Sequence, residues 1–227
     1  MTRVLIVDDQ ALVRAGFRAI LEAQPDLEVV GEAQDGVEAV ERGRALDPDV
    51  VLMDIRMPRL DGIEATRRLC ADDGWPGRII ALTTYDADEN VWDALHAGAS
   101  AFVLKTATAE ELADAVRTVA AGQELLAPEV THRLVREFLS HPRPGDRPRS
   151  LKGLTEREAE VLRLVAAGRS NADIAAEMFL AESTVKSHIN RVFAKLGVRD
   201  RVQAVVLAYE SGFVAPGRRP SGTSEAP

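Results

Sequence analysis

Four charged side chains in this sequence come directly after short apolar runs. They are Asp8, Asp9, Asp54 and Lys105, and the runs are residues 4–7, 50–53 and 101–104. Runs this short and this continuously apolar are typical of strands buried in a parallel sheet. Helix-patterned stretches separate them, so right-handed crossovers bring the carboxyl ends of the strands to one edge of the sheet. We therefore expect three carboxylates and one ammonium group to meet in one crevice.

Three acids gathered in one place call for a divalent cation. Mg²⁺ prefers hard oxygen ligands and keeps positions open for water and phosphate oxygens. If Asp8 and Asp9 hold the ion, Asp54 can be both a ligand and a nucleophile toward phosphorus, which would give an acyl phosphate. Lys105 would offer a positive charge to the phosphoryl oxygens, and the hydroxyl of Thr83 could bond to one of them. Taken singly, an acid pair or a strand threonine is ordinary, so the prediction depends on the combination.

Strand and helix patterns alternate five times, which predicts an α/β domain with a doubly wound, five-stranded parallel sheet. Strands are expected near residues 3–7, 27–33, 50–54, 78–83 and 101–104. Helices are expected near residues 11–24, 36–46, 62–71, 88–97 and 108–121. A small all-α domain of four helices should follow this sheet.

The second half of the chain contains a linker and short capped helices. Residues 124–140 have helical spacing, and 141–150 hold three prolines and no apolar residue, which indicates a connecting helix and a linker. Four helices should begin near the capping box Thr155–Glu158, at Ser170, at about Glu182 and at Asp200. The expected division is 1–122 and 151–213 as domains, 123–150 as connecting helix and linker, and 214–227 as a disordered tail.

Charge is unevenly distributed along the 227 residues, whose net charge is −8. Residues 1–120 carry 12 basic and 23 acidic side chains, whereas 151–212 carry 9 and 8, which indicates two modules with different partners. No apolar stretch reaches the ~20 residues of a membrane span, and the chain enters a strand at once, which leaves no room for a signal peptide. The one cysteine, Cys70, excludes an internal disulfide framework and fits a reducing cytoplasm.

The helix expected near 182–196 has two different faces. Its apolar stripe consists of Val185, Ile189, Val192 and Leu196, at the spacing of one buried face. Its polar and partly basic face consists of Lys186, Ser187, Asn190, Arg191 and Lys195. The recognition helix of a helix-turn-helix unit has this character, but a solvated helix face explains the spacing at least as well. The next helix offers apolar residues for pairing or for the core, at Val202, Val205, Val206 and Tyr209.

Residues 3–121 resemble the receiver domain of two-component response regulators. The resemblance rests on Asp8-Asp9, Met53–Pro58 with Asp61-Gly62, Leu82–Thr84 and Phe102–Lys105. It implies a flavodoxin/CheY-like sheet with strand order 2-1-3-4-5 and phosphorylation of Asp54 to 4-aspartylphosphate. Many members of this family have a cis-proline where Thr106 stands here.

The same resemblance implies roles for the acids and for a switch pair. Direct ligands of Mg²⁺ (or Mn²⁺) would be Asp9, Asp54 and the backbone carbonyl of Arg56, with Asp8 acting through water. Lys105 and Thr83 would assist the phosphoryl chemistry. Thr83 and Phe102 would form the switch, in which the hydroxyl moves to the phosphoryl group and the ring turns inward.

Residues 152–213 resemble the LuxR-type DNA-binding domain of the NarL subfamily. The resemblance rests on Leu154–Glu158, Gly168, Asn171, Ile174-Ala175, Thr184–Ile189, Lys195–Val198, Arg201 and Ala204. It implies that Lys186, Ser187 and Asn190 face base edges, whereas Arg191 and Lys195 contact phosphates. Ala181 stands where a capping serine is common, and an alanine there costs ~0.5–2 kcal/mol of helix stability.

Together the resemblances imply a cytoplasmic DNA-binding response regulator that is not an enzyme, although its receiver assists its own Mg²⁺-dependent phosphorylation and dephosphorylation. A cognate sensor histidine kinase would phosphorylate Asp54 and so control homodimerisation and binding to paired half-sites in promoter DNA, with no membrane partner. A nucleotide- or flavin-binding protein or an aspartate phosphatase is disfavoured, because Asp8-Asp9-Gln10 lacks a phosphate cradle and the second phosphatase acid. A regulator that works without phosphate stays open, although the complete set of acids, threonine and lysine argues against it.

Overall fold

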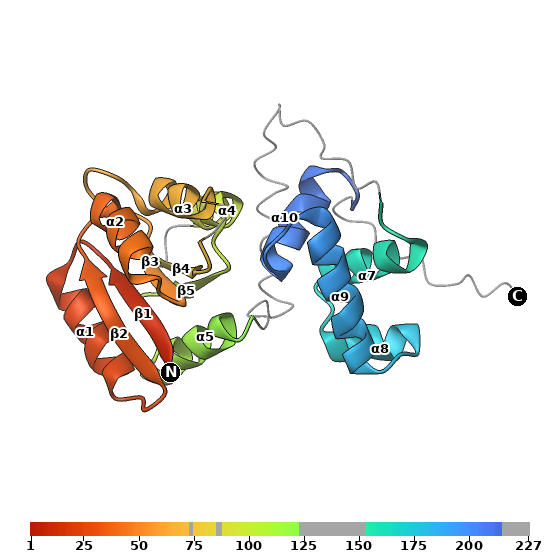
Figure 1. Ribbon diagram of the computed structural model, residues 1–227, viewed down its shortest axis with the longest axis horizontal. Helices are drawn as coiled ribbons and strands as arrows, with labels where there is room; N and C mark the ends of the chain where they lie inside the picture. The colour runs from red at the N-terminus through yellow and green to blue at the C-terminus, as the bar shows by residue number, and fades with distance from the viewer. Residues whose placement is uncertain (73–74, 85–87, 123–152, 215–227) are drawn as a thin grey trace, which may run out of the picture. The chain divides into compact units, whose positions relative to one another are not determined.

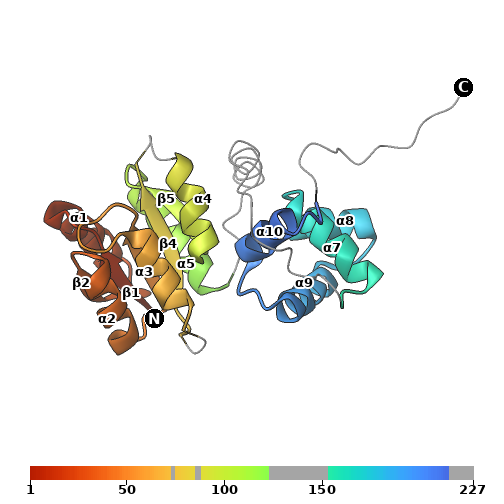
Figure 2. The same cartoon turned by 90° about the horizontal axis from the view of Figure 1, so that it is seen from above.

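The computed structural model describes residues 1–72, 75–84, 88–122 and 153–214, without the side chains of 88–90 and 92. The chain divides into two compact units, Met1–Leu126 and Ala127–Pro227. The first is an α/β unit and the second is all-helical (Figures 1 and 2). The predicted connecting helix and linker at 124–150 and the tail beyond residue 214 lie outside the described residues.

Strands and helices alternate through the first unit. Its strands are β1 (Thr2–Val7), β2 (Leu27–Ala33), β3 (Val50–Asp54), β4 (Arg78–Thr83) and β5 (Ala101–Leu104). Its helices are α1 (Ala11–Glu22), α2 (Gly36–Leu46), α3 (Gly62–Cys70), α4 (Asp88–Ala97) and α5 (Ala109–Ala120). Each of these elements confirms a predicted one to within two residues at either end.

The sheet is entirely parallel and has the strand order β2-β1-β3-β4-β5, as the receiver resemblance implied. Val7 of β1 is paired with Met53 of β3, so Asp8, which follows β1, and Asp54, which ends β3, lie side by side. Thr83 of β4 is paired with Leu104 of β5, which puts Lys105 at the same edge. The register of the sheet therefore brings the charged residues together.

Helices cover both faces of this sheet (Figure 1). Helices α1 and α5 are packed together on one side, and α2, α3 and α4 follow one another on the other. On the first side, Ile6 and Leu52 pack in one cluster with Phe17, Leu112 and Val116. Burial on both faces explains why the strand sequences are continuously apolar rather than alternating.

The loop between β3 and α3 closes tightly on the end of the strand. The Gly62 amide donates to the carbonyl of Ile55 at 2.9 Å, and the Asp61 carboxylate caps α3 by accepting from the Glu64 amide at 2.8 Å. A Cβ atom added at Gly62 would overlap the carbonyl oxygen of Asp54. Glycine at this position therefore sets how closely the loop approaches the strand end.

The second unit consists of α7 (Glu156–Ala166), α8 (Asn171–Met178), α9 (Glu182–Leu196) and α10 (Arg201–Glu210). Thr155 and Ser170 open α7 and α8 with capping boxes, and the Asp200 side chain caps α10. Helix α9 begins after Ala181 without a side-chain cap and ends at Gly197, whose φ is 66°. These four helices confirm the prediction, as does the uncapped start of α9. No helix in the described part of the chain is long and apolar enough to cross a membrane.

An ion pair fastens the C-terminal end of α9 to the start of α7. The Lys195 ammonium lies 2.6 Å from the Glu158 carboxylate and donates to the Gly153 carbonyl at 3.1 Å. Glu158 is buried and also accepts from the Thr155 amide at 2.7 Å. The hydrogen bond from Lys195, with those from Thr155, lowers the pKa of Glu158 to about 2.

The apolar stripe of α10 belongs to the core of the second unit. Its four members are buried: Val202, Val205, Val206 and Tyr209. The Tyr209 hydroxyl donates to the Ala166 carbonyl of α7 at 3.1 Å. Of the two interpretations of this stripe, the structure supports the core.

Replacing Gly62 with alanine should destabilise the first unit by about 1–3 kcal/mol, because the new Cβ overlaps a backbone oxygen that cannot move freely. Urea unfolding followed by tryptophan fluorescence measures this, since both tryptophans lie in that unit. Gly16→Ala is the matched control: this glycine is exposed in α1, nothing lies within 4 Å of its added Cβ, and the change should stabilise by about 0.5–1 kcal/mol. Equal effects of the two substitutions would contradict the prediction.

Replacing Glu158 with glutamine should lower the thermal midpoint of the second unit at neutral pH. Because the folded-state pKa lies near 2, below the ordinary 4.5, ionised Glu158 stabilises the fold above pH 4.5 and loses that contribution as the pH falls toward 2. The wild-type and Glu158→Gln midpoints should therefore converge on acidification. Thermal unfolding is followed by circular dichroism and by tryptophan fluorescence. Because the second unit contains no tryptophan, a transition seen by circular dichroism alone reports its unfolding. Glu160→Gln, which removes an exposed partner of Arg157, should show little change at any pH.

Candidate metal centre and helix-turn-helix unit

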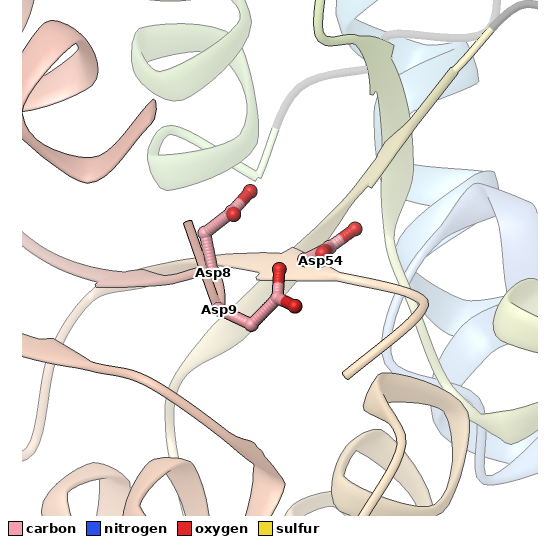
Figure 3. A group of neighbouring side chains, drawn as sticks. All are labelled: Asp8, Asp9 and Asp54. Carbon is pink, nitrogen blue, oxygen red and sulfur yellow. The ribbon is translucent and has the colours of Figure 1, made fainter. Parts of the chain in front are cut away.

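Three carboxylates meet at the carboxyl end of the sheet (Figure 3). Asp8 and Asp9 follow β1 and Asp54 ends β3, and oxygens of all three lie within 4.8 Å of one another. Asp8 and Asp54 are buried, whereas Asp9 is exposed. The predicted convergence of these acids is confirmed, with one of them open to solvent.

Lys105 supplies the positive charge that was expected at this edge. Its Nζ atom lies 2.7 Å from Asp8 Oδ2 and 2.9 Å from Asp54 Oδ2. Burial raises the pKa of Asp54, the Asp8 charge adds to this, and the contact with Lys105 opposes it. Burial works against the charge of Lys105, but the two carboxylates outweigh it and raise the lysine pKa. Lys105 thus favours the ionised form of Asp54 but does not fully offset the effect of its burial.

The donor set fits a hard divalent cation. Three carboxylates face one ammonium group, so negative charge exceeds positive charge at this edge of the sheet. Asp8 Oδ2 is buried and lies 2.7 Å from the Lys105 ammonium, which also contacts Asp54, so one cation is shared between two of the acids. An ion with oxygen ligands would offset the repulsion and use this oxygen.

A pocket opens beside the acids and is lined by the loop after β3. Asp9, Arg56, Met57, Pro58 and Asp61 contribute to its wall. The backbone amide of Arg56 also bonds to Asp54, which lowers the pKa of that acid a little and holds the loop against the strand end. A ligand on the acids would therefore be contacted by this loop.

The same loop is tied to α2 by an ion pair that the sequence did not reveal. Arg59 has a φ of 64°, in the left-handed region, and its guanidinium pairs with the buried carboxylate of Asp35. Asp35 also caps α2, accepting from the Val37 amide at 2.8 Å. The Gly36 amide donates to the Leu60 carbonyl at 3.0 Å. An acid before a glycine at a helix start signals a cap, but nothing local signals its distant arginine.

Thr83 and Phe102 lie on the neighbouring strands β4 and β5. Thr83 is buried at the end of β4, and its hydroxyl donates to the Thr84 carbonyl at 3.1 Å. Phe102 is half-buried. The backbone amide of Lys105 donates to the Thr83 carbonyl at 2.8 Å, and no described peptide bond is cis, so the lysine reaches the acids with threonine at position 106.

Helices α8 and α9 form the predicted helix-turn-helix unit. The apolar stripe of α9 is buried at Val185, Ile189 and Val192 and half-buried at Leu196. The opposite face is exposed at Lys186, Ser187, Asn190 and Arg191. Lys195 differs from them because it is bound to Glu158.

Both units match known families. Residues 4–117 match the response regulator receiver domain, and residues 152–208 match the bacterial regulatory proteins of the luxR family. The transcriptional regulatory protein LiaR of Bacillus subtilis is 44% identical over 214 residues, which cover 94% of this chain and 100% of that protein. The response regulator protein VraR of Staphylococcus aureus is 39% identical over 213 residues, covering 93% and 98%. A solved structure of the response regulator RcsB–DNA complex is 26% identical, with a TM-score of 0.52, covering 92% of this chain and 98% of that one.

The two family matches fall on the two structural units, and each relative is similar over nearly the whole chain. The sheet order and the acids at its edge agree with the first match, and the exposed face of α9 agrees with the second. This chain therefore belongs to the response regulators that join a receiver domain to a LuxR-type DNA-binding domain, a family of transcriptional regulators.

Proposed function

We propose that phosphorylation of Asp54 by a sensor histidine kinase controls the binding of promoter DNA by α9. The observation that carries this proposal is the position of the Asp54 carboxylate, 2.9 Å from Lys105 and beside two further acids, of which Asp9 lines a pocket. Burial penalises the charge of Asp54, and the contact with Lys105 does not fully offset this penalty. This arrangement supports a role for the Asp54 carboxylate as the nucleophile that accepts a phosphoryl group.

In the proposed reaction an Asp54 oxygen attacks phosphorus. The bond from phosphorus to the imidazole nitrogen of the phosphohistidine breaks, and the nitrogen keeps the electron pair, so an acyl phosphate forms. Asp9, Asp54 and the Arg56 carbonyl would hold Mg²⁺ or Mn²⁺ directly, with Asp8 acting through water. The ion would supply positive charge to the phosphoryl oxygens. Lys105, already between two carboxylates, would exchange one of them for a phosphoryl oxygen.

Thr83 and Phe102 would carry the signal away from Asp54. The Thr83 hydroxyl donates to a backbone carbonyl, so it can exchange this partner for a phosphoryl oxygen without leaving a buried group unpaired. Phe102, half-buried one strand away, would then turn inward. Such a rearrangement of two side chains is the kind of packing change that favours one conformation of a domain over another.

DNA reading would fall to the exposed face of α9. Lys186, Ser187 and Asn190 would face base edges, and Arg191 would contact phosphate. Lys195 was implied as a second phosphate contact, but its ammonium is bound to buried Glu158, so we assign it mainly to the fold of this unit. Since one such helix covers few base pairs, a phosphorylated homodimer on paired half-sites completes the proposal.

Incubating the full chain with Mg²⁺ and a small phosphodonor should add the mass of one phosphoryl group, and Asp54→Asn should abolish this gain. Asp9→Asn should reduce the rate by about tenfold or more at limiting Mg²⁺, because an exposed ligand is lost while the fold is kept. Intact-mass spectrometry measures both. Asp114→Asn, which changes an exposed acid of α5, is the control. An undiminished gain in Asp54→Asn would place the nucleophile elsewhere.

Arg191→Ala and Lys195→Ala should weaken DNA binding in different ways. Loss of a phosphate contact at Arg191 should lower the affinity and reduce the slope of log affinity against log salt by about one, with no change in thermal midpoint. Lys195→Ala should instead lower the midpoint of the second unit, because it leaves the Glu158 carboxylate buried without its cation. Binding titrations at several salt concentrations, with thermal unfolding of both variants, separate the effects. If Lys195→Ala instead reduced the slope of log affinity against log salt by about one without changing the thermal midpoint, Lys195 would be a phosphate contact.

A further inference from the structure

Phe179 is unusual both in its backbone conformation and in its exposure to solvent. It is the C-cap residue of α8, with φ 55° and ψ 45°, in the left-handed region that aromatic residues rarely adopt. Its side chain is 94% exposed, so the ring gains nothing from packing in this unit. A residue that is strained and unpacked is a candidate for a role outside the fold.

The turn at the end of α8 requires a left-handed backbone at position 179, but it does not require an aromatic side chain there. The Leu180 amide donates to the Ala175 carbonyl at 2.9 Å, which closes the end of α8 in the way that a left-handed residue permits. Helix α9 makes the corresponding turn with Gly197, at φ 66° and without strain. Glycine or asparagine at position 179 would serve the backbone better.

The position of Phe179 points to DNA as the partner of its ring. It stands three residues before α9, and the N-terminal residues of a recognition helix are those that enter the major groove. The turn before that helix consequently lies at the edge of the groove. The acids nearest to it in the chain are both paired with cations, Glu177 with Arg169 at 3.8 Å and Glu182 with Lys186 at 3.7 Å. Their charge is thus partly offset where phosphates would approach.

We propose that Phe179 binds DNA through an apolar contact with a deoxyribose or a thymine methyl group at the edge of the groove that α9 enters. Thymine methyls and sugar faces accept such contacts from apolar side chains. The inference rests on the proposed DNA binding by α9 and adds to it a residue that lies outside the recognition helix. The contact involves no phosphate charge.

Full-length Phe179→Gly and Phe179→Asn test this with a duplex selected from random sequence by the phosphorylated wild-type protein. Both variants should raise the thermal midpoint of the second unit by about 2–6 °C, because the left-handed turn is relieved. Both should weaken DNA binding by about five- to thirtyfold, since the contact of one aromatic ring is lost. The salt slope should stay unchanged, because no phosphate contact is removed. A merely structural role would not combine higher stability with weaker binding.

Phe179→Leu is the matched control, since it keeps an apolar side chain and should retain more affinity than the glycine or asparagine variant. Leu12→Asn, which alters another exposed apolar residue in the first unit, should leave affinity unchanged. Unchanged affinity in both Phe179→Gly and Phe179→Asn overturns the inference, as does a reduced salt slope. Unchanged DNA affinity with reduced transcription in vitro would assign the ring to a protein partner and overturn it as well. Arg191→Ala distinguishes failure of this inference from failure of the proposed function. If Arg191→Ala weakens DNA binding while the Phe179 variants do not, α9 binds DNA but Phe179 does not contact it.

Discussion

Repulsion between buried carboxylates is the constraint on which the α/β unit depends. Asp8 and Asp54 are held side by side by the pairing of β1 with β3. The preceding residues of both strands are apolar and buried, so the two acids cannot move apart without disrupting the core. Lys105 offsets part of this repulsion, yet burial, together with the Asp8 charge, still raises the pKa of Asp54. The packing free energy of the apolar sheet therefore holds the acids close together against their repulsion, and under the proposed function a cation or a phosphoryl group would change that balance.

Under the proposed function, the contacts around the acids would pass this change on to the rest of the domain. The loop after β3 is held at one end by the close approach of Gly62 to the strand and in its middle by Arg59 on buried Asp35. On the other side, the Thr83 hydroxyl has a backbone partner that it can exchange. A rigid loop and an exchangeable hydroxyl beside one charged centre suit a domain with two discrete states rather than a gradual response.

Local patterns predicted the elements, the caps of the second unit's helices and the meeting of the acids, because each depends on residues close in sequence or on the general rule that parallel strands share one edge. Pairings between distant residues were beyond such patterns. No local pattern indicated that Lys195 pairs with Glu158, 37 residues away, or that Arg59 pairs with Asp35. The stripe of α10 had two interpretations because periodicity shows that a face is buried but not what buries it. Phe179 was missed because sequence does not show a residue's backbone angle or exposure.

The two ends of α9 are stabilised differently, and the difference suits its task. At the C-terminal end, Gly197 closes the turn and the Lys195 ammonium pairs with Glu158, so this end is fastened to α7. At the N-terminal end, Ala181 provides no side-chain cap, and the turn before it contains the strained Phe179. Amide groups at a helix start that lack a side-chain partner favour an anion, and phosphate oxygens are such partners. Under the proposed function, this less firmly fixed end of α9 is the one that would approach DNA, while the other end holds the helix to α7.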